Sequence, residues 1–358
     1  MSHARIAVVI SGFPRLSETF AVNELLALAE RDVLAALFAT KPGDGTPPQL
    51  GSERLSKLLT VLPDAGADGQ AAVVAYALKN RNVKAVHGYF AHQPAEVAWR
   101  AAERLRVLSG FSVHAKDARK ISSSELGLRA TRAACVVACN NDVASAIQKT
   151  GARVHLIPHG VDLQRFKANP LPAKGTFQIL AVGRLVEKKG FHLLIEAASR
   201  LKFPFQLRII GDGPERERLA QMISAYDLSN RVSLCGPRTH DQLPEEYARA
   251  HVVAVPSIVD EAGDRDGLPN VVLEAMASSC AVVASRTGAI DAAVKDLETG
   301  LLLPAGDPLS LATALTRLAQ DLPLRMGLAG TARTYVEQHY EMKTCSERFC
   351  RLLEEAYA

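Results

Sequence analysis

Short apolar runs alternate with segments of helical spacing along almost the whole chain, and this alternation limits the folds that it can adopt. Runs such as residues 6–10 and 134–138 are continuously apolar, which is typical of strands buried on both faces of a sheet. Helical segments, for example residues 20–31 and 93–105, stand between the runs. This pattern predicts an α/β fold with doubly wound parallel sheets.

The alternation is interrupted once, at residues 166–176, and then resumes. This segment contains two prolines, a glycine and two lysines, a composition typical of an interdomain linker. A chain of 358 residues is also long for a single hydrophobic core. We therefore expect two Rossmann-like domains, at residues 1–168 and 169–343, facing each other across a cleft. Ligands of such sheets bind at the carboxyl ends of the strands.

The overall composition excludes several classes of protein. Hydrophobic residues make up 48% of the chain and charged residues 22%, which favours a globular protein over a disordered one. No apolar run is long enough to span a bilayer, and residues 1–11 lack the features of a secretory signal, so we expect a cytoplasmic protein. The six cysteines form no C-x-x-C pair, so we expect no zinc site. The net charge of +4 suits a phosphate-bearing substrate, an anionic membrane surface or a merely solvated exterior, and we expect no nucleic-acid partner.

The stretch R-D-G-L-P-N-V-V-L-E-A-M-A, residues 265–277, places a tight turn before an apolar helix that carries one carboxylate. Pro269 suits the first helical turn, and Gly267 lets the backbone bend and approach a ligand. The predicted helix would direct its free N–H groups and positive dipole end at phosphate oxygens. Glu274 would lie roughly 7.5 Å along the helix axis. Asp266 and Glu274 are therefore candidates for binding hydroxyls at the two ends of a phosphorylated ligand.

A group of cations follows another predicted strand. The run I-L-A-V-G-R-L contains Gly183 and Arg184, and Lys188 and Lys189 come shortly afterwards. Gly183 permits a close approach of the backbone to a ligand. Arg184 and Lys189 can place fixed positive charges beside a diphosphate, where they would stabilise a leaving phosphate in place of a metal ion. We expect Lys188 to be a solvated surface residue.

Three motifs together carry a family resemblance. They are G-R-L-x-x-x-K-G at residues 183–190, I-I-G-D-G-P at 209–214 and G-L-P-x-x-x-x-E-A-M-A at 267–277. The chain resembles the retaining GT-B glycosyltransferases of family four over essentially its whole length. The sequence S-G-F-P-R-L-S-E-T-F, at residues 11–20, is similar to the members that act on exopolysaccharide and lipopolysaccharide. The family usually has glutamate where this chain has Asp266, an acid that is shorter by one methylene.

The resemblance implies roles for individual residues. His114 would lie beside the reacting carbon and would form the catalytic set with Arg184, Lys189 and Asp266. Asp266 would bind the hydroxyls of the transferred sugar, and Glu274 would bind the ribose of the nucleotide. The donor site as a whole would comprise Gly12, Gly183, Arg184, Lys189, Gly213, Pro237, Asp266, Gly267, Leu268, Pro269 and Glu274.

Other segments receive roles that depend on the same resemblance. The loops at residues 211–213 and 235–238 would flank the base, and a last helix at about residues 344–358 would cross back onto the first domain. Candidates for the wall of an acceptor pocket are Phe13, Arg15, Glu18 and His92.

The resemblance implies transfer of a sugar from a nucleotide-diphosphate donor, with retention of the anomeric configuration. The acceptor would be a hydroxyl of a saccharide, a lipid-linked molecule or a small molecule. A UDP-sugar is the preferred donor, with GDP-mannose as the alternative. No cofactor or metal is expected, because the D-R-D sequence at residues 264–266 lies in a polar loop rather than directly after a buried strand. Peripheral association with the inner face of the membrane would suit a lipid-linked acceptor.

Two other functions remain open at this point. A nicotinamide-dependent oxidoreductase would carry a full G-x-G-x-x-G sequence, but here Arg216 occupies the position of the third glycine. A non-catalytic sugar-nucleotide-binding protein would bind its ligand without turnover. The presence of His114, Arg184, Lys189 and Glu274 in one chain argues against that second alternative.

Overall fold

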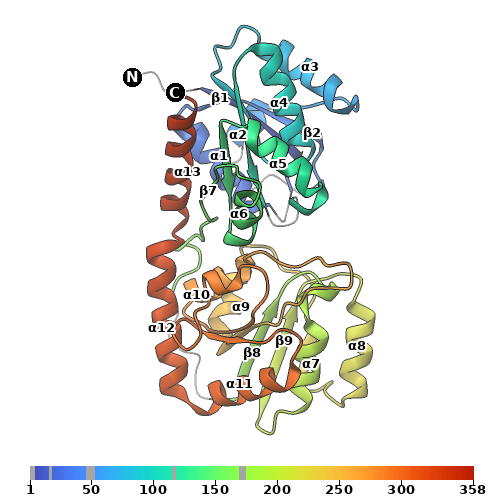
Figure 1. The fold of residues 1–358 in the computed structure, drawn as a ribbon. Helices are drawn as coiled ribbons and strands as arrows, with labels where there is room; N and C mark the ends of the chain where they lie inside the picture. Colours follow the sequence, from blue (N-terminus) through green and yellow to red (C-terminus); the bar gives the residue numbers. More distant parts are fainter. Residues whose placement is uncertain (1–4, 16–17, 46–52, 115–117, 169–174) are drawn as a thin grey trace. The chain divides into compact units, whose positions relative to one another are not determined.

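The computed structural model describes residues 5–15, 18–45, 53–114, 118–168 and 175–358. The chain divides into two units (Figure 1). Unit 1 is formed by Met1–Gly160 together with Met342–Ala358, and unit 2 by Val161–Glu341. Each unit contains one parallel sheet with helices on both faces, which confirms the prediction of an α/β fold with two Rossmann-like domains.

The sheet of unit 1 has seven strands in the order β3-β2-β1-β4-β5-β6-β7. The strand order reverses between β1 and β4, which are parallel neighbours. Every residue of β1 is buried, which explains the continuously apolar run at residues 6–10. The strands are β1 Ile6–Phe13, β2 Leu34–Pro42, β3 Leu59–Val61, β4 Ala85–Gly88, β5 Leu108–Val113, β6 Cys135–Ala138 and β7 His155–Leu156.

Alternate residues of β1 enter different cores of unit 1. Ile6, Val8 and Ile10 pack with α1, α2 and α13, whereas Ala7 and Val9 pack with α3 and α4 on the other face. A third cluster joins α5 and α6 to β5 and β6. The helices are α1 Thr19–Glu30, α2 Glu53–Leu58, α3 Gly66–Leu78, α4 Gln93–Leu105, α5 Ser123–Arg132, α6 Asn141–Gln148 and α13 Met342–Ala356.

The final helix, which we expected to return to the first domain, is α13 and packs against α1 in unit 1 (Figure 1). Arg31 of α1 donates to both carboxylate oxygens of Glu354, at 3.0 and 2.9 Å. Tyr357 is fully buried, and its hydroxyl lies 2.8 Å from Nδ1 of His87 on β4. Burial lowers the pKa of His87 to about 3, so this imidazole is a neutral structural group.

The sheet of unit 2 has six strands in the order β10-β9-β8-β11-β12-β13, and the order reverses between β8 and β11. The strands are β8 Phe177–Val182, β9 Phe205–Ile210, β10 Val232–Leu234, β11 Val252–Val255, β12 Ala281–Ser285 and β13 Leu301–Leu303. One face is covered by α7 Phe191–Ser199, α8 Arg216–Ala225 and α11 Pro308–Gln320. The other face is covered by α9 Leu243–Arg249, α10 Asn270–Ala277 and α12 Leu322–His339.

The structure differs from the sequence expectations at two places in this framework. Strands β2 and β3 belong to the first sheet, although the alternation of the sequence did not identify them. The junction between the units falls before Val161, because the Val161 amide donates to the carbonyl of Tyr340 at 2.8 Å and Phe166 is buried against Tyr247. The expected linker, residues 166–176, lies partly outside the described residues.

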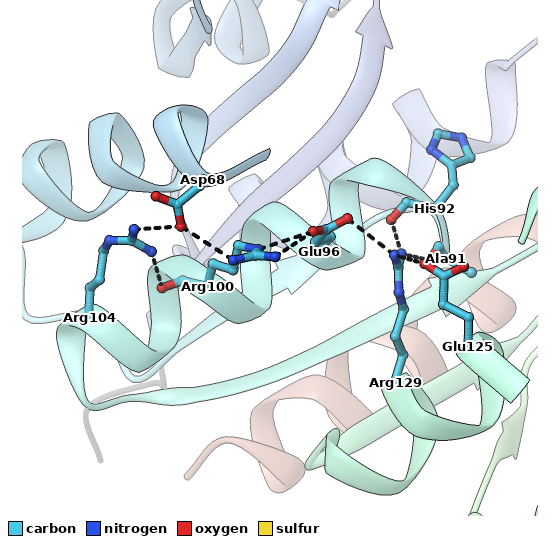
Figure 2. Close-up of polar contacts among 8 residues, drawn as sticks. All are labelled: Asp68, Ala91, His92, Glu96, Arg100, Arg104, Glu125 and Arg129. Carbon is cyan, nitrogen blue, oxygen red and sulfur yellow. Dashed lines mark hydrogen bonds and ion pairs between the residues drawn. The ribbon is translucent and has the colours of Figure 1, made fainter. Parts of the chain in front are cut away.

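A network of ion pairs connects α3, α4 and α5 in unit 1 (Figure 2). Arg129 of α5 is its best buried member, with 13% of its side chain exposed. Its guanidinium donates to the backbone carbonyls of Ala91, at 2.6 Å, and His92, at 2.5 Å, and it also pairs with Glu96 and Glu125. Arg129 therefore holds the loop between β4 and α4 in place.

Replacing Arg129 should destabilise unit 1 measurably. Arg129→Met would remove the guanidinium hydrogen bonds to the carbonyls of Ala91 and His92, and the loss of such bonds costs about 1–3 kcal/mol. We expect the Tm in a thermal unfolding experiment to fall by roughly 3–10 °C. The matched control is Arg104→Met, which removes an ion pair with the exposed Asp68 and should change the Tm little. Equal effects of the two variants would contradict the anchoring role of Arg129.

Candidate functional site

The carboxyl ends of β8 and β11 lie side by side in unit 2, where the order of the strands reverses. The segment after β8 supplies Gly183, Arg184 and Lys189, and the segment after β11 supplies Ser257 and Asp266. The two segments are joined by a hydrogen bond from the amide at position 258 to the carbonyl at position 188, of length 2.8 Å. This is the position at which open α/β sheets bind their ligands.

Asp266 is the centre of a buried cluster of charges. Its side chain is 9% exposed, and Oδ2 lies 2.9 Å from Nζ of Lys189 and accepts a hydrogen bond of 2.8 Å from the Ser257 hydroxyl. Lys188 Nζ lies 2.9 Å from Oδ2 of Asp264 and 3.7 Å from Oδ1 of Asp266. The expectation that Lys188 is merely solvated is wrong, because its side chain is only 16% exposed and is held by these two acids.

Arg184 lies at the same edge but in a different environment. It is exposed directly after β8, and among the described residues its guanidinium has no ion-pair or hydrogen-bond partner. Its five N–H donors are therefore available for an anionic ligand. The sequence grouped Lys189 and Arg184 as one cationic pair. Among the described residues, Lys189 pairs with a carboxylate and Arg184 does not.

Glu274 lies in α10, and 6% of the residue is exposed. The hydroxyl of Tyr247, on α9, donates to Oε2 of Glu274 at 2.8 Å, and Nε2 of His240 lies 3.4 Å from Oε1. Burial, and then the charge of Glu274, raises the pKa of Tyr247 well above its usual value of 10.0, so the phenol keeps its proton and acts as the donor. One carboxylate oxygen is thereby fixed, while the other faces the weaker contact with His240.

Two details of the turn before α10 differ from expectation. Pro269 is the N-cap residue, with φ −68° and ψ 136°, so the helix begins one position later, at Asn270. Gly267 does not have a positive φ. The tight packing is instead permitted by Gly288, with φ +59°, where a Cβ atom would overlap the carbonyl oxygen of Asp266. Gly288 escaped the sequence analysis because a single glycine after a buried strand is a common feature.

The two loops expected near the base are joined to each other and to the segment after β8. The Gly211 amide donates to the carbonyl of Gly236 at 3.0 Å, and the Leu185 amide donates to the carbonyl of Asp212 at 2.9 Å. The Pro237 carbonyl accepts from the Arg238 side chain at 3.1 Å. The remaining residues predicted for the donor site in unit 2, Gly213 and Leu268, lie in these same loops and in the turn before α10.

His114 lies in unit 1, directly after β5, and is 9% exposed. Its ring is surrounded by those of Phe20, Tyr89, Phe90 and His159, with centroid distances of 5.1, 5.3, 4.9 and 5.0 Å. Burial, and then the neighbouring imidazoles, hold the pKa of His114 well below its usual value of 6.5. The ring is therefore neutral at physiological pH.

The other predicted residues of unit 1 are distributed between the core and the edge of β1. Phe13 is 4% exposed and packs in the core beneath α1, so its role as a pocket wall has no support from its position. Arg15 and Glu18 form an ion pair of 3.3 Å. Gly12 lies against β2, where a Cβ atom would approach the carbonyl oxygen of Pro42 to 2.7 Å, so its small size already has a packing reason.

His92 caps the start of α4 and stacks on Phe90 at 5.7 Å, with 5° between the ring planes. Burial and the nearby Lys120 lower the pKa of His92 to about 4. The ring is therefore neutral, and Nε2 can accept a hydrogen bond from Lys120 Nζ at 3.3 Å. A neutral imidazole at a helix start could contact a hydroxyl, but not through a charge.

Several residues of these clusters were not identified from the sequence. In unit 2 they are Lys188, Ser257, Tyr247 and His240. In unit 1 the sequence did not identify Glu24, which forms an ion pair with His159 next to His114. Within the described ranges, no three His, Cys, Asp or Glu side chains are arranged to hold a metal ion, and no helix is long and apolar enough to cross a membrane.

Two family models match the chain. The Glycosyltransferase Family 4 model matches residues 17–165, and the Glycosyl transferases group 1 model matches residues 163–335. The putative colanic acid biosynthesis glycosyltransferase WcaL of Escherichia coli K12 is 32% identical, over 59% of this chain and 54% of its own length. A GDP-mannose-dependent alpha-(1-6)-phosphatidylinositol monomannoside mannosyltransferase of Mycolicibacterium smegmatis is 33% identical, over 59% of this chain and 58% of its own length. The chain thus spans little more than half the length of these curated relatives.

Solved structures share the fold. Anabaena HepE in complex with UDP has a TM-score of 0.85 and 21% identity, with 98% of this chain and 100% of that chain covered. HepE in complex with UDP-glucose gives a TM-score of 0.80 at 21% identity, with 98% and 99% covered. The fold class is therefore GT-B. From the two matched models, the three sequence motifs and this fold, we conclude that the chain belongs to the group 1 glycosyl transferases whose N-terminal domain is of glycosyltransferase family 4.

Proposed function

We propose that the protein is a retaining glycosyltransferase that uses a nucleotide-diphosphate sugar, preferably a UDP-sugar, and transfers the sugar to a hydroxyl group. The observation that carries this proposal is the group of side chains at the strand-order reversal of unit 2. There, buried Asp266 is paired with Lys189, Arg184 is exposed in the segment after β8, and Glu274 lies on the helix that follows Asp266. Cations for a diphosphate and acids for two sets of hydroxyls are thus supplied by one edge of one sheet.

Each residue has a chemical task in this proposal. Glu274, oriented by Tyr247, accepts hydrogen bonds from the ribose hydroxyls. Asp266, whose Oδ2 is already held by Lys189 and Ser257, presents Oδ1 to the hydroxyls of the transferred sugar. Arg184 and Lys189 stabilise the negative charge that builds up on the leaving diphosphate.

The proposed reaction exchanges one carbon–oxygen bond for another on the same face of the sugar. The bond from the anomeric carbon to the phosphate oxygen breaks while the bond to the acceptor oxygen forms, and the acceptor proton passes to an oxygen of the leaving diphosphate. Positive charge develops on the sugar ring during this exchange. His114 is neutral, so it can contact the ring without electrostatic repulsion. No metal is assigned a role, because lysine ammonium groups occupy the sites beside Asp264 and Asp266.

The compared proteins support the choice of donor and acceptor class. HepE was crystallised with UDP and UDP-glucose, which favours uridine, whereas the mycobacterial relative is named as GDP-mannose-dependent. WcaL is named for colanic acid biosynthesis, which favours a saccharide or lipid-linked acceptor in polysaccharide synthesis. Another relative is named a D-inositol 3-phosphate glycosyltransferase, of Corynebacterium urealyticum, which supports a small-molecule acceptor as the alternative. We expect the reaction to take place in the cytoplasm, at the inner face of the membrane for a lipid-linked acceptor.

A panel of donors tests the proposal without knowledge of the acceptor. The protein is mixed with UDP- and GDP-sugars, and slow release of the nucleotide by hydrolysis is monitored. We expect release from one sugar nucleotide above all others, and an increase of the Tm with the matching nucleotide but not with NAD. Stabilisation by NAD alone would favour an oxidoreductase, and binding without any nucleotide release would favour a non-catalytic protein. Either result would overturn the proposal.

A further inference from the structure

A buried pair of opposite charges lies next to His114 in unit 1. Oε1 of Glu24, on α1, is 2.8 Å from Nδ1 of His159, in the segment after β7. The hydroxyl of Tyr89 donates to the other carboxylate oxygen of Glu24. The side chains of Glu24 and His159 are 8% and 15% exposed. Both carboxylate oxygens of Glu24 are therefore engaged, so this side chain is held in place and fixes the orientation of the His159 ring.

The His159 ring is also packed against the rings of His114 and Phe20. It lies nearly parallel to His114, with 5.0 Å between the centroids and 13° between the planes. Phe20 stacks on His159 at 4.1 Å and contacts His114 at 5.1 Å. A change in the position of His159 would therefore move His114 directly. The order of contacts runs from Glu24 through His159 to His114.

The two imidazoles carry different charges. Burial opposes a charge on His159, but the Glu24 carboxylate and Cys139 overcome this and raise its pKa to about 10. Burial and then the charge of His159 keep the pKa of His114 below its usual value. Titratable groups that face these two rings, or the Tyr89 ring packed against His114, are Glu18, Glu24, His87, His92 and Cys139.

We propose that Glu24 and His159 are positioning residues for His114, and that their charge pair fixes the plane of the His114 ring and, in addition to burial, keeps the ring unprotonated. The carboxylate holds a proton on His159, and this positive imidazolium, stacked on His114, repels a second one. The catalytic consequence rests on the proposed function: a neutral ring is required beside a sugar that becomes positively charged. The physical part concerns unit 1 alone and is independent of the donor.

Two substitutions separate the charge from the packing. Glu24→Gln keeps the size of the side chain and an acceptor for Tyr89, but it removes the negative charge that protonates His159. His159→Phe keeps a flat ring between Phe20 and His114 and removes the positive charge. If His159→Phe fails to fold, Glu24→Gln still tests the proposal, because the amide can occupy the same site.

The decisive measurement is the titration of His114 by NMR in the full chain without substrate, with histidine labelled and His114 assigned by His114→Asn. We expect both variants to raise the pKa of His114 relative to the wild type. His251 of unit 2 serves as the internal control, because its ring stacks on Phe177 in the other unit and its titration should not change. An unchanged pKa of His114 in both variants would overturn the proposal whatever happens to turnover.

The pH profile of nucleotide release provides the catalytic readout. In both variants the acidic limb should move to higher pH, and turnover near neutral pH should fall by about 10- to 100-fold through loss of ring placement. A merely structural role would lower the Tm and leave the acidic limb where it is. If His114 titrates as we expect but the wild type releases no nucleotide from any sugar donor, the proposed function fails and the positioning pair stands.

The free energy of unfolding gives an independent check with a definite sign. Because the pKa of His159 is raised in the folded state, its contribution is fully present below pH 6.5 and is lost as the pH rises towards about 10. The stability difference between the wild type and His159→Phe should therefore shrink across this range. A difference that stays constant from pH 6.5 to 10 would show that His159 is not a charged imidazolium in the folded protein, and it would overturn the proposal.

Discussion

Lys189→Met should lower the turnover of the proposed transferase by about 10²- to 10³-fold, the range expected when one preorganised electrostatic group is removed from a reacting centre. The ammonium of Lys189 lies 2.9 Å from Oδ2 of Asp266, and exposed Arg184 lies in the same segment after β8. Its loss removes a cation next to the leaving diphosphate and also frees Asp266 Oδ2, which then retains the Ser257 hydroxyl. We expect the effect mainly in kcat, measured as nucleotide release from the donor that the panel identifies.

Two further variants make this result specific. Lys189→Arg keeps the positive charge and should recover part of the lost turnover, because a guanidinium can still reach a carboxylate and a phosphate. Lys202→Met removes an exposed lysine of the same unit and should have no effect. Wild-type kcat in Lys189→Met would remove Lys189 from the reaction. A fall in Tm without any recovery by Lys189→Arg would mean that the residue serves only the packing of Asp266.

Glu274→Gln should weaken the binding of the free nucleotide by roughly 10- to 150-fold, which corresponds to the loss of about 1.5–3 kcal/mol for hydrogen bonds to a charged group. Glu274 is buried, with 6% of the residue exposed, so solvent screens its charge little. Glutamine keeps an oxygen for the Tyr247 hydroxyl, so we expect the fold of α10 to persist. Isothermal titration of the protein with UDP measures the effect directly.

The control for this variant is Glu245→Gln on the neighbouring α9, where the side chain is 77% exposed and pairs with Arg249. It should bind UDP as the wild type does. If Glu274→Gln and the wild type bind UDP equally well, Glu274 does not contact the ribose. Its burial against Tyr247 would then be a purely structural arrangement.

The fold followed from the sequence because its main signal is local. Runs such as β1 are buried along their whole length, and the helices between them have the spacing of one apolar face. Strand β2 was not identified, although its first seven residues are all buried. The run L-A-A-L-F-A-T holds three alanines, which occur in helices as readily as in buried strands. The spacing of its apolar residues therefore did not distinguish a strand from a helix.

The candidate site was only partly predictable, because many of its contacts join residues that are far apart in the sequence. Asp266, Lys189 and Glu274 belong to short motifs, so a reader of the sequence can find them. Their partners cannot be found in this way, because Glu24 and His159 are separated by 135 positions and meet only through the fold. Lys188 was misjudged because nothing in its neighbours shows that Asp264 comes to lie beside it. Long-range pairing of charges has no local period to reveal it.

The packing of α13 in unit 1 has a consequence for folding during synthesis. On the ribosome, the strands of the first sheet emerge early, but the helix that carries Phe349, Leu353 and Tyr357 follows only after all of unit 2 has been synthesised. Until then, the apolar surface of β1, β6 and α1 that these side chains cover stays uncovered. Unit 1 therefore cannot complete its core until the end of synthesis. All residues of unit 2 leave the exit tunnel before the last residues of unit 1 do.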